Sequence, residues 1–188
     1  MSYPSEVEKH RTEIERTGYR KNKEVEITKG IVAYDSVYGN TKQVAEAIAE
    51  QIRAEGHEVE LISIKDEGGG ASIGDFLFIG SPTRIGRMTK GAKGFVERLD
   101  REYWKSRPIV VFDTVGPLSE DAEKRKKWLS RIDKSAAVRM QELAKQRGLS
   151  VHPEVLHIAV TGFKGPLAVD ALDMARSFTH QFVATLKR

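Results

Sequence analysis

The chain has 188 residues, of which 39% are hydrophobic and 31% are charged, a balance that predicts one domain with a buried core and a soluble surface. Its 31 basic and 27 acidic residues are interspersed, so the formal net charge of +4 does not indicate a nucleic-acid surface. There is no cysteine, which excludes disulfides, thiol catalysis and cysteine-ligated iron–sulfur clusters, so any redox centre would be an organic cofactor.

Metal binding and membrane insertion are not expected either. The five histidines are scattered, and His152 and His157 would point to opposite faces of a strand, so we expect no metal site. No apolar run is long enough to span a bilayer, and the charged N-terminus lacks the apolar segment of a signal peptide. The sequence therefore predicts a cytoplasmic protein.

Residues 1–26 form a charged N-terminal extension. We expect a short helix over residues 5–16, in which Val7 and Ile14 are the only large apolar residues. Because so small an apolar face buries little surface, we expect this segment to be a loose arm. The domain itself would span residues 27–188.

Strands and helices alternate regularly in the domain. Apolar runs and β-branched residues predict strands over residues 29–35, 57–64, 76–79, 109–112 and 154–161. Apolar residues at three- and four-residue spacing predict helices over residues 41–55, 90–99, 119–147 and 167–186. The glycine-rich residues 66–73 would form a loop. This alternation predicts an α/β fold of three layers, in which helices cover both faces of an open, five-stranded parallel sheet.

The loop after the first predicted strand is a candidate phosphate cradle. Residues 36–41 combine hydroxyl, amide and glycine residues and lead directly into a helix. A helix N-terminus offers unpaired backbone N–H groups to an anion, and Gly39 would let the backbone approach it closely. The alternative is an ordinary loop in which Asn40 or Thr41 merely caps the helix.

Other phosphate-binding and catalytic motifs are absent from the sequence. The first loop has neither the spacing of an NTPase loop nor the Gly-x-Gly-x-x-Gly of a dinucleotide fold. The third predicted strand ends in Gly80 and Ser81, without the carboxylate that a phospho-receiver needs. No Ser/His/Asp set lies in a nucleophile elbow, so no catalytic side chain is predicted.

Residues 34–41, Tyr-Asp-Ser-Val-Tyr-Gly-Asn-Thr, resemble the FMN-phosphate loop of the flavodoxin family. Residues 80–88 are similar to the flavin-ring loop of flavodoxin-like quinone reductases of the WrbA type, which read Pro-Thr-Arg-aromatic-Gly. The resemblance covers about residues 27–188. It implies the strand order 2-1-3-4-5 with FMN at the switch point, an arrangement for which flavodoxin itself is the standard example.

The resemblance implies FMN-binding residues in three loops. They are Ser36, Val37, Tyr38, Gly39, Asn40, Thr41, Pro82, Thr83, Arg84, Ile85, Gly86, Thr114, Val115 and Gly116. Arg84 would donate to carbonyl oxygens of the ring or stabilise reduced flavin, the alternative being a surface salt bridge. Ile85 and Val115 stand where flavodoxins often place aromatic rings, so we expect weaker stacking on the flavin.

Three functions remain open at this point. The first is an FMN-binding electron carrier that serves a redox partner protein or a small quinone-like acceptor. The second is an NAD(P)H-dependent FMN quinone reductase of the WrbA type, which would be a homo-oligomer because the open flavin face would need a neighbouring chain. The third is a flavodoxin-fold binding module that has lost FMN.

The net positive charge of the chain limits which partner proteins would fit it. Many flavodoxins are strongly acidic, so a partner that expects an acidic carrier would be a poor match for this basic chain. The basic residues 124–127 would be a solvated helix face or, alternatively, a docking site.

Overall fold

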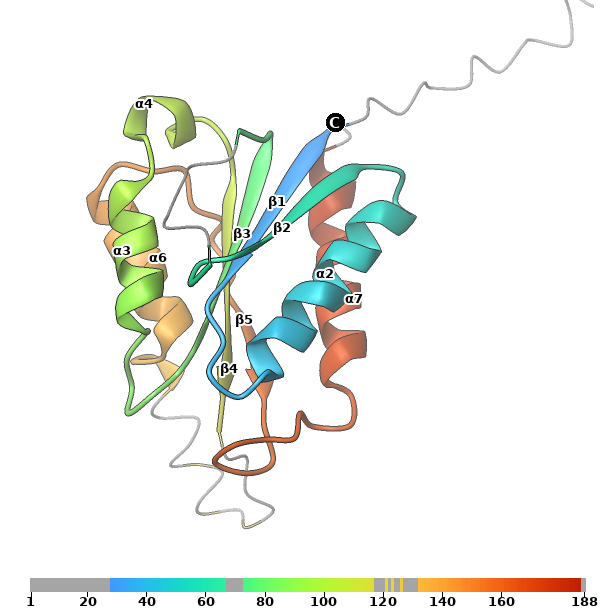
Figure 1. The fold of residues 1–188 in the computed structure, drawn as a ribbon, viewed down its shortest axis with the longest axis vertical. Helices are drawn as coiled ribbons and strands as arrows, with labels where there is room; N and C mark the ends of the chain where they lie inside the picture. Colours follow the sequence, from blue (N-terminus) through green and yellow to red (C-terminus); the bar gives the residue numbers. More distant parts are fainter. Residues whose placement is uncertain are drawn as a thin grey trace, which may run out of the picture.

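The computed structural model describes residues 28–66, 73–116, 121, 123, 126 and 132–186. Its five strands form one parallel sheet in the order β2-β1-β3-β4-β5, with helices on both faces (Figure 1). The predicted α/β class and strand order are therefore confirmed. The predicted helix over residues 5–16 and the basic residues 124, 125 and 127 lie outside the described residues.

The strands follow the predicted apolar runs, but their ends differ. They are β1 (Lys29–Tyr34), β2 (Glu58–Ser63), β3 (Phe76–Pro82), β4 (Ile109–Val115) and β5 (Leu156–Ala159). β3 and β4 extend past their predicted ends at residues 79 and 112, because their ladder continues through the buried polar pair Ser81 and Asp113. β5 is shorter than predicted, since it is an edge strand whose ladder with β4 ends at Ala159.

The helices are α2 (Asn40–Ala54), α3 (Lys90–Arg98), α4 (Arg101–Trp104), α6 (Ala136–Gln146) and α7 (Ala171–Leu186). The prediction of one helix over residues 119–147 is wrong, because residues 133–135 are not helical and Ser135 caps a new helix by accepting from Val138 N. α7 begins later than predicted, because Leu167 pairs with Val160 and Ala168 N donates to Ala159 O. The short α4 was not predicted.

Two hydrophobic layers enclose the sheet. On one face, strand residues such as Ile31 and Val111 pack with residues of α3, α4 and α6. On the other face, residues such as Val32 and Phe78 pack with α2 and α7. Because side chains alternate between the two covered faces, the inner strands read as continuous apolar runs. Among the residues that the structure describes, no helix is both long and apolar enough to cross a membrane.

Gly80, in a central strand, leaves space for the ring of Phe112 on the neighbouring strand. It lies opposite Phe112 in the ladder of β3 and β4, and a Cβ at this position would lie 2.1 Å from Phe112 Cζ. We expect Gly80→Ala to lower the free energy of unfolding by about 1–3 kcal/mol through overpacking, measured by urea denaturation.

Gly94→Ala is the matched control for this prediction. Gly94 lies in α3, where a new Cβ would meet only the flexible end of Arg98, at 3.0 Å. Because alanine is the better helix former, this change should stabilise the protein by about 0.5–1 kcal/mol. Equal effects of the two substitutions would contradict the prediction.

Candidate functional site

The connections after β1, β3, β4 and β5 leave the sheet at one edge, the lower edge in Figure 1. They enclose a cavity of about 180 Å³. It is lined by Val37, Tyr38, Asn40, Thr41, Pro82, Thr83, Arg84, Ile85, Thr114, Gly116, Val160 and Phe163. The structure thus brings the three predicted loops together, and the only predicted residues that do not line the cavity are Ser36, Gly39, Gly86 and Val115.

The first loop presents free N–H groups of a helix N-terminus to this cavity. Gly39 is the N-cap of α2, in a left-handed conformation with φ of 88°, and it has no side chain to cap the helix. Ser36 Oγ accepts from Lys42 N, at 3.3 Å, but not from the first two N–H groups. Asn40 and Thr41 lie inside the helix, so the alternative in which one of them serves as the cap is wrong. Within the described part of the chain, their backbone N–H groups have no acceptor, whereas Gln43 N donates to Gly39 O at 3.0 Å. These free N–H groups, at the positive end of the helix dipole, suit an anion.

The side chains of this first turn connect it to two other loops. Thr41 Oγ1 lies 2.9 Å from Thr114 Oγ1, and both residues are buried. Two hydroxyl groups carry two protons and their mutual bond uses one, which leaves the other for a ligand. Asn40 Nδ2 donates to the backbone oxygen of Lys164 at 2.9 Å and so holds the loop after β5 against α2.

The second loop is anchored by a buried carboxylate. Asp113 is fully buried and accepts from Thr83 Oγ1 at 2.7 Å and from Ala137 N at 3.0 Å. Its other oxygen lies 2.9 Å from His157 Nδ1. Thr83 Oγ1 in turn accepts from Ala136 N at 2.7 Å, so its proton and one lone pair are engaged within the protein. Thr83 therefore faces the cavity with its hydroxyl already committed to holding the loop.

Neither Asp113 nor His157 was predicted as a functional residue. The sequence did contain a signal for Asp113, since this carboxylate ends an apolar strand. A charge buried at such a position needs hydrogen-bond partners, which indicates a polar network around it. The break before α6 supplies one of them, Ala137 N, and directs the neighbouring Ala136 N at the hydroxyl of Thr83, which itself donates to Asp113.

A tight turn forms the outer part of the second loop. Arg84 and Arg87 exchange backbone hydrogen bonds of 2.9 and 3.0 Å around Ile85 and Gly86, which have φ of 50° and 66°. The Ile85 side chain is 98% exposed. A β-branched residue at positive φ is an outlier, and here no burial of the side chain compensates for it.

Two aromatic rings border the cavity, although the two positions at which the resemblance implies aromatic residues are occupied by Ile85 and Val115. Tyr38 and Phe163 have ring centroids 6.4 Å apart. The guanidinium of Arg84 lies 5.7 Å from the centre of the Tyr38 ring, within the range of a cation–π contact. In the described residues Arg84 forms no salt bridge, so the structure does not support that alternative. Phe163 was missed because it comes from the loop after β5, where no motif pointed to a ligand.

Comparison with known proteins identifies the family. A family model described as a flavodoxin domain matches residues 31–186. The chain belongs to the flavodoxin family. A search of curated proteins finds no match.

Solved flavodoxins share the fold of this flavodoxin domain. An archaeal flavodoxin matches with 22% identity and a TM-score of 0.62, over 85% of this chain and 99% of that one. Flavodoxin 1 of Bacillus cereus matches with 22% identity and a TM-score of 0.62, over 83% and 97% of the two chains. A WrbA-like flavodoxin of Agrobacterium tumefaciens matches with 22% identity and a TM-score of 0.52, over 86% and 99%. At these identities the likeness establishes the fold alone.

The residues of this flavodoxin domain fit FMN, the cofactor that the family generally binds. A Cβ at Gly39 would meet nothing within 4 Å, so the space beside the uncapped N–H groups is open. A phosphate would satisfy these donors and the remaining hydroxyl proton of the Thr41 and Thr114 pair. The rings of Tyr38 and Phe163 and the charge of Arg84 border the rest of the cavity.

Proposed function

We propose that this flavodoxin domain binds FMN in the cavity and transfers electrons through it. The observation that carries the proposal is the N-terminus of α2, where Gly39 has a positive φ and the N–H groups of the first two helical residues have no acceptor in the described residues. It lies at the edge of a cavity lined by Tyr38, Arg84 and Thr114. When bound, FMN would supply the one- and two-electron chemistry, for which the protein needs no acid or base.

The residues of the chain have distinct proposed roles. The backbone N–H groups of Asn40 and Thr41 would hold the phosphate, and Thr114 would orient the Thr41 hydroxyl. Tyr38 would cover the flavin, and Arg84 would stabilise negative charge on the reduced ring. The electrons would pass to a partner protein or a small quinone-like acceptor, in the cytoplasm.

Titration with FMN tests this function. We expect saturable quenching of flavin fluorescence with one FMN per chain, and a yellow protein on purification. Riboflavin, which has the same ring but no phosphate, is the matched control ligand and should bind at least about ten-fold more weakly, because it leaves the charge-assisted hydrogen bonds of the cradle unmade. A colourless protein that does not quench FMN would instead favour a binding module that has lost the cofactor.

A quinone reductase of the WrbA type is the second candidate. It is favoured by the second loop, in which Pro82, Thr83 and Arg84 all line the cavity. Mixing the FMN-loaded protein with NADH or NADPH without oxygen separates the two functions. Rapid bleaching of the flavin would support the reductase, and a flavin that stays oxidised would support the carrier.

A further inference from the structure

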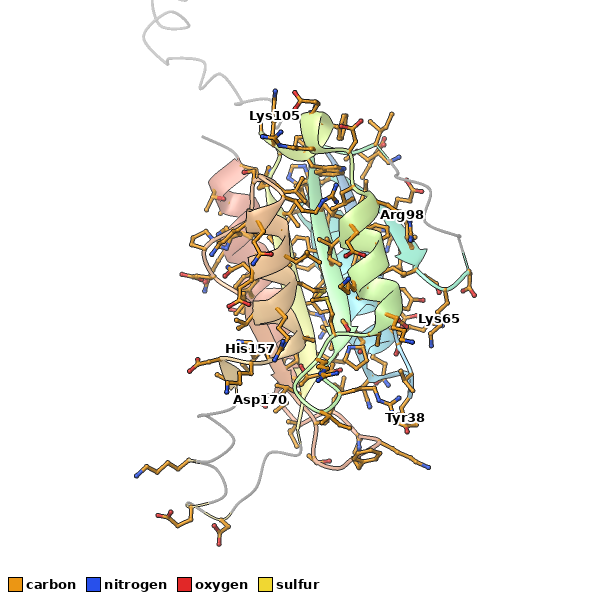
Figure 2. The ribbon with its side chains drawn as sticks, turned by 90° about the vertical axis from the view of Figure 1, so that its left-hand side faces the viewer. Tyr38, Lys65, Arg98, Lys105, His157 and Asp170 are labelled. Atoms are coloured by element: carbon orange, nitrogen blue, oxygen red, sulfur yellow. The ribbon has the colours of Figure 1, made fainter. Side chains whose placement is uncertain are left out.

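Exposed apolar side chains gather around the mouth of the cavity. Of the described large apolar residues, the exposed ones are Val37, Tyr38, Ile73, Ile85, Phe163, Val169 and Met174. All except Ile73 lie in the loops after β1, β3 and β5 or in the first turn of α7, at the carboxyl edge of the sheet. Figure 2 shows Tyr38 at this lower end of the molecule and Lys105 at the opposite end. Single exposed apolar residues are ordinary, whereas a cluster of them at one edge marks an interaction site.

Ile85 is the most informative member of this cluster. It is 98% exposed and has φ of 50°, in a two-residue turn where asparagine or glycine would be unstrained. Its side chain therefore gains almost nothing from contacts within the chain. Phe163, on the loop after β5, has 76% of its surface exposed, although its ring lies 6.4 Å from that of Tyr38. Contacts with another molecule would explain both residues.

The charged side chains next to these apolar residues are positive, and they form no salt bridge within the described ranges. Arg84, Arg87 and Lys164 form no salt bridge with any carboxylate in the described ranges. Elsewhere in the described ranges several lysines do form such pairs, as Lys29 with Glu60, Lys42 with Glu46, Lys93 with Glu97 and Lys105 with Glu102, whereas among the arginines only Arg176 does. The nearby carboxylates of Asp35 and Asp113 are buried, and Asp170 lies at the far end of the loop after β5. Arg87 and Lys164 thus have no acidic partner in the described ranges and are available to an external one, whereas Arg84 also lines the cavity.

We propose that a basic rim, made of Arg84, Ile85, Arg87, Phe163 and Lys164, docks an electron-transfer protein whose surface carries carboxylates around an apolar centre. The inference rests on the proposed function, since electrons must leave through this opening. Arginine and aromatic residues are enriched at the centres of protein interfaces, whereas membrane-binding segments depend on longer runs of basic residues. Complementary charge would select the partner and speed its encounter with the rim.

Charge reversal at two rim residues outside the cavity lining tests this docking surface. Arg87→Glu with Lys164→Glu is the test variant, because both side chains are exposed and neither residue lines the cavity. Arg53→Glu with Arg98→Glu, on the exposed faces of α2 and α3, makes the same change in net charge away from the rim. Figure 2 shows Arg98 well above Tyr38.

The reduced, FMN-loaded proteins are mixed by stopped flow with two haem proteins of opposite charge, an acidic b-type cytochrome and the basic cytochrome c. We expect the wild type to reduce the acidic cytochrome with a rate that falls as salt is added, and the rim variant to be about ten-fold slower at low salt. The control variant should stay within about two-fold of the wild type, because its charges lie outside the interface. Equal rates for the rim and control variants, or a wild type that reacts faster with the basic cytochrome under matched driving force, would overturn the proposal.

Two further measurements separate this inference from other outcomes. Calorimetric titration of the acidic cytochrome into the flavin-free protein measures docking without electron transfer. If the protein does not bind FMN, the proposed function is refuted, but this titration can still test the docking surface. Absence of heat in that titration would refute the surface. If the wild type co-sediments with phosphatidylserine vesicles and the rim variant does not, the rim binds a membrane surface. That result would also overturn the proposal.

Discussion

Replacing Asp113 by alanine is expected to lower the free energy of unfolding by about 3–5 kcal/mol, because this buried side chain is the common hydrogen-bond partner of three groups. Thr83 Oγ1, Ala137 N and His157 Nδ1 all lie within 3.0 Å of this carboxylate, which is fully buried. For a chain of this length the loss corresponds to a fall in Tm of about 10 °C. Urea and thermal denaturation followed by circular dichroism measure it.

Asp113→Asn is the matched control for this prediction. Its side-chain oxygen can still accept from both Thr83 Oγ1 and Ala137 N, which share one carboxylate oxygen in Asp113. Its amide nitrogen is a donor and cannot act as the acceptor that the second carboxylate oxygen offers to His157 Nδ1. We expect the asparagine variant to fall between the wild type and the alanine variant in stability. A loss for Asp113→Ala within about 0.5 kcal/mol of the wild type, as at an ordinary surface position, would show that the network is dispensable.

The combined change Asn40→Ala and Thr41→Val is expected to weaken FMN binding by about 3 kcal/mol, or more than about 100-fold. Thr41→Val removes a hydroxyl that is proposed to donate to the phosphate, and it leaves the buried Thr114 hydroxyl without its partner at 2.9 Å. Asn40→Ala releases the loop after β5, which the Asn40 amide holds through the backbone oxygen of Lys164. Quenching of FMN fluorescence gives the two dissociation constants.

Thr179→Val provides the control for losing a buried threonine hydroxyl. Thr179 lies in α7, away from the cavity lining, and its hydroxyl donates to Ala175 O at 2.8 Å. It should leave the FMN dissociation constant unchanged. If the double variant at Asn40 and Thr41 also binds FMN as the wild type does, the phosphate assignment is refuted.

The strands and the first loop could be predicted because their signals are local in sequence, whereas the strand order was implied by the resemblance to flavodoxins. Buried parallel strands read as continuous apolar runs, and the residues of the phosphate cradle are consecutive along the chain. The ends of β3 and β4 were harder to predict. Ser81 and Asp113 are polar, yet they stay in the ladder because each side chain has a hydrogen-bond partner, Thr89 N for Ser81 and Thr83 Oγ1 for Asp113.

The remaining parts of the site depend on contacts between distant residues. Asp113 and His157 are 44 positions apart, and only the register of β4 with β5 places them side by side. Phe163 reaches the cavity from a loop whose sequence has no recognisable motif. Apolar spacing also continued through the break before Ser135, so the sequence pattern predicted one long helix where the structure begins a new one.

The anchoring of the second loop has a consequence for the order in which the molecule assembles. Thr83 follows the third strand, but it is fixed by Ala136, by Asp113 and, through that carboxylate, by His157. When the first loop and β3 have been synthesised, the growing chain still lacks α6 and β5. We therefore expect the second loop to reach its final conformation late in folding, after most of the chain has left the ribosome, and the proposed FMN site to be complete only then.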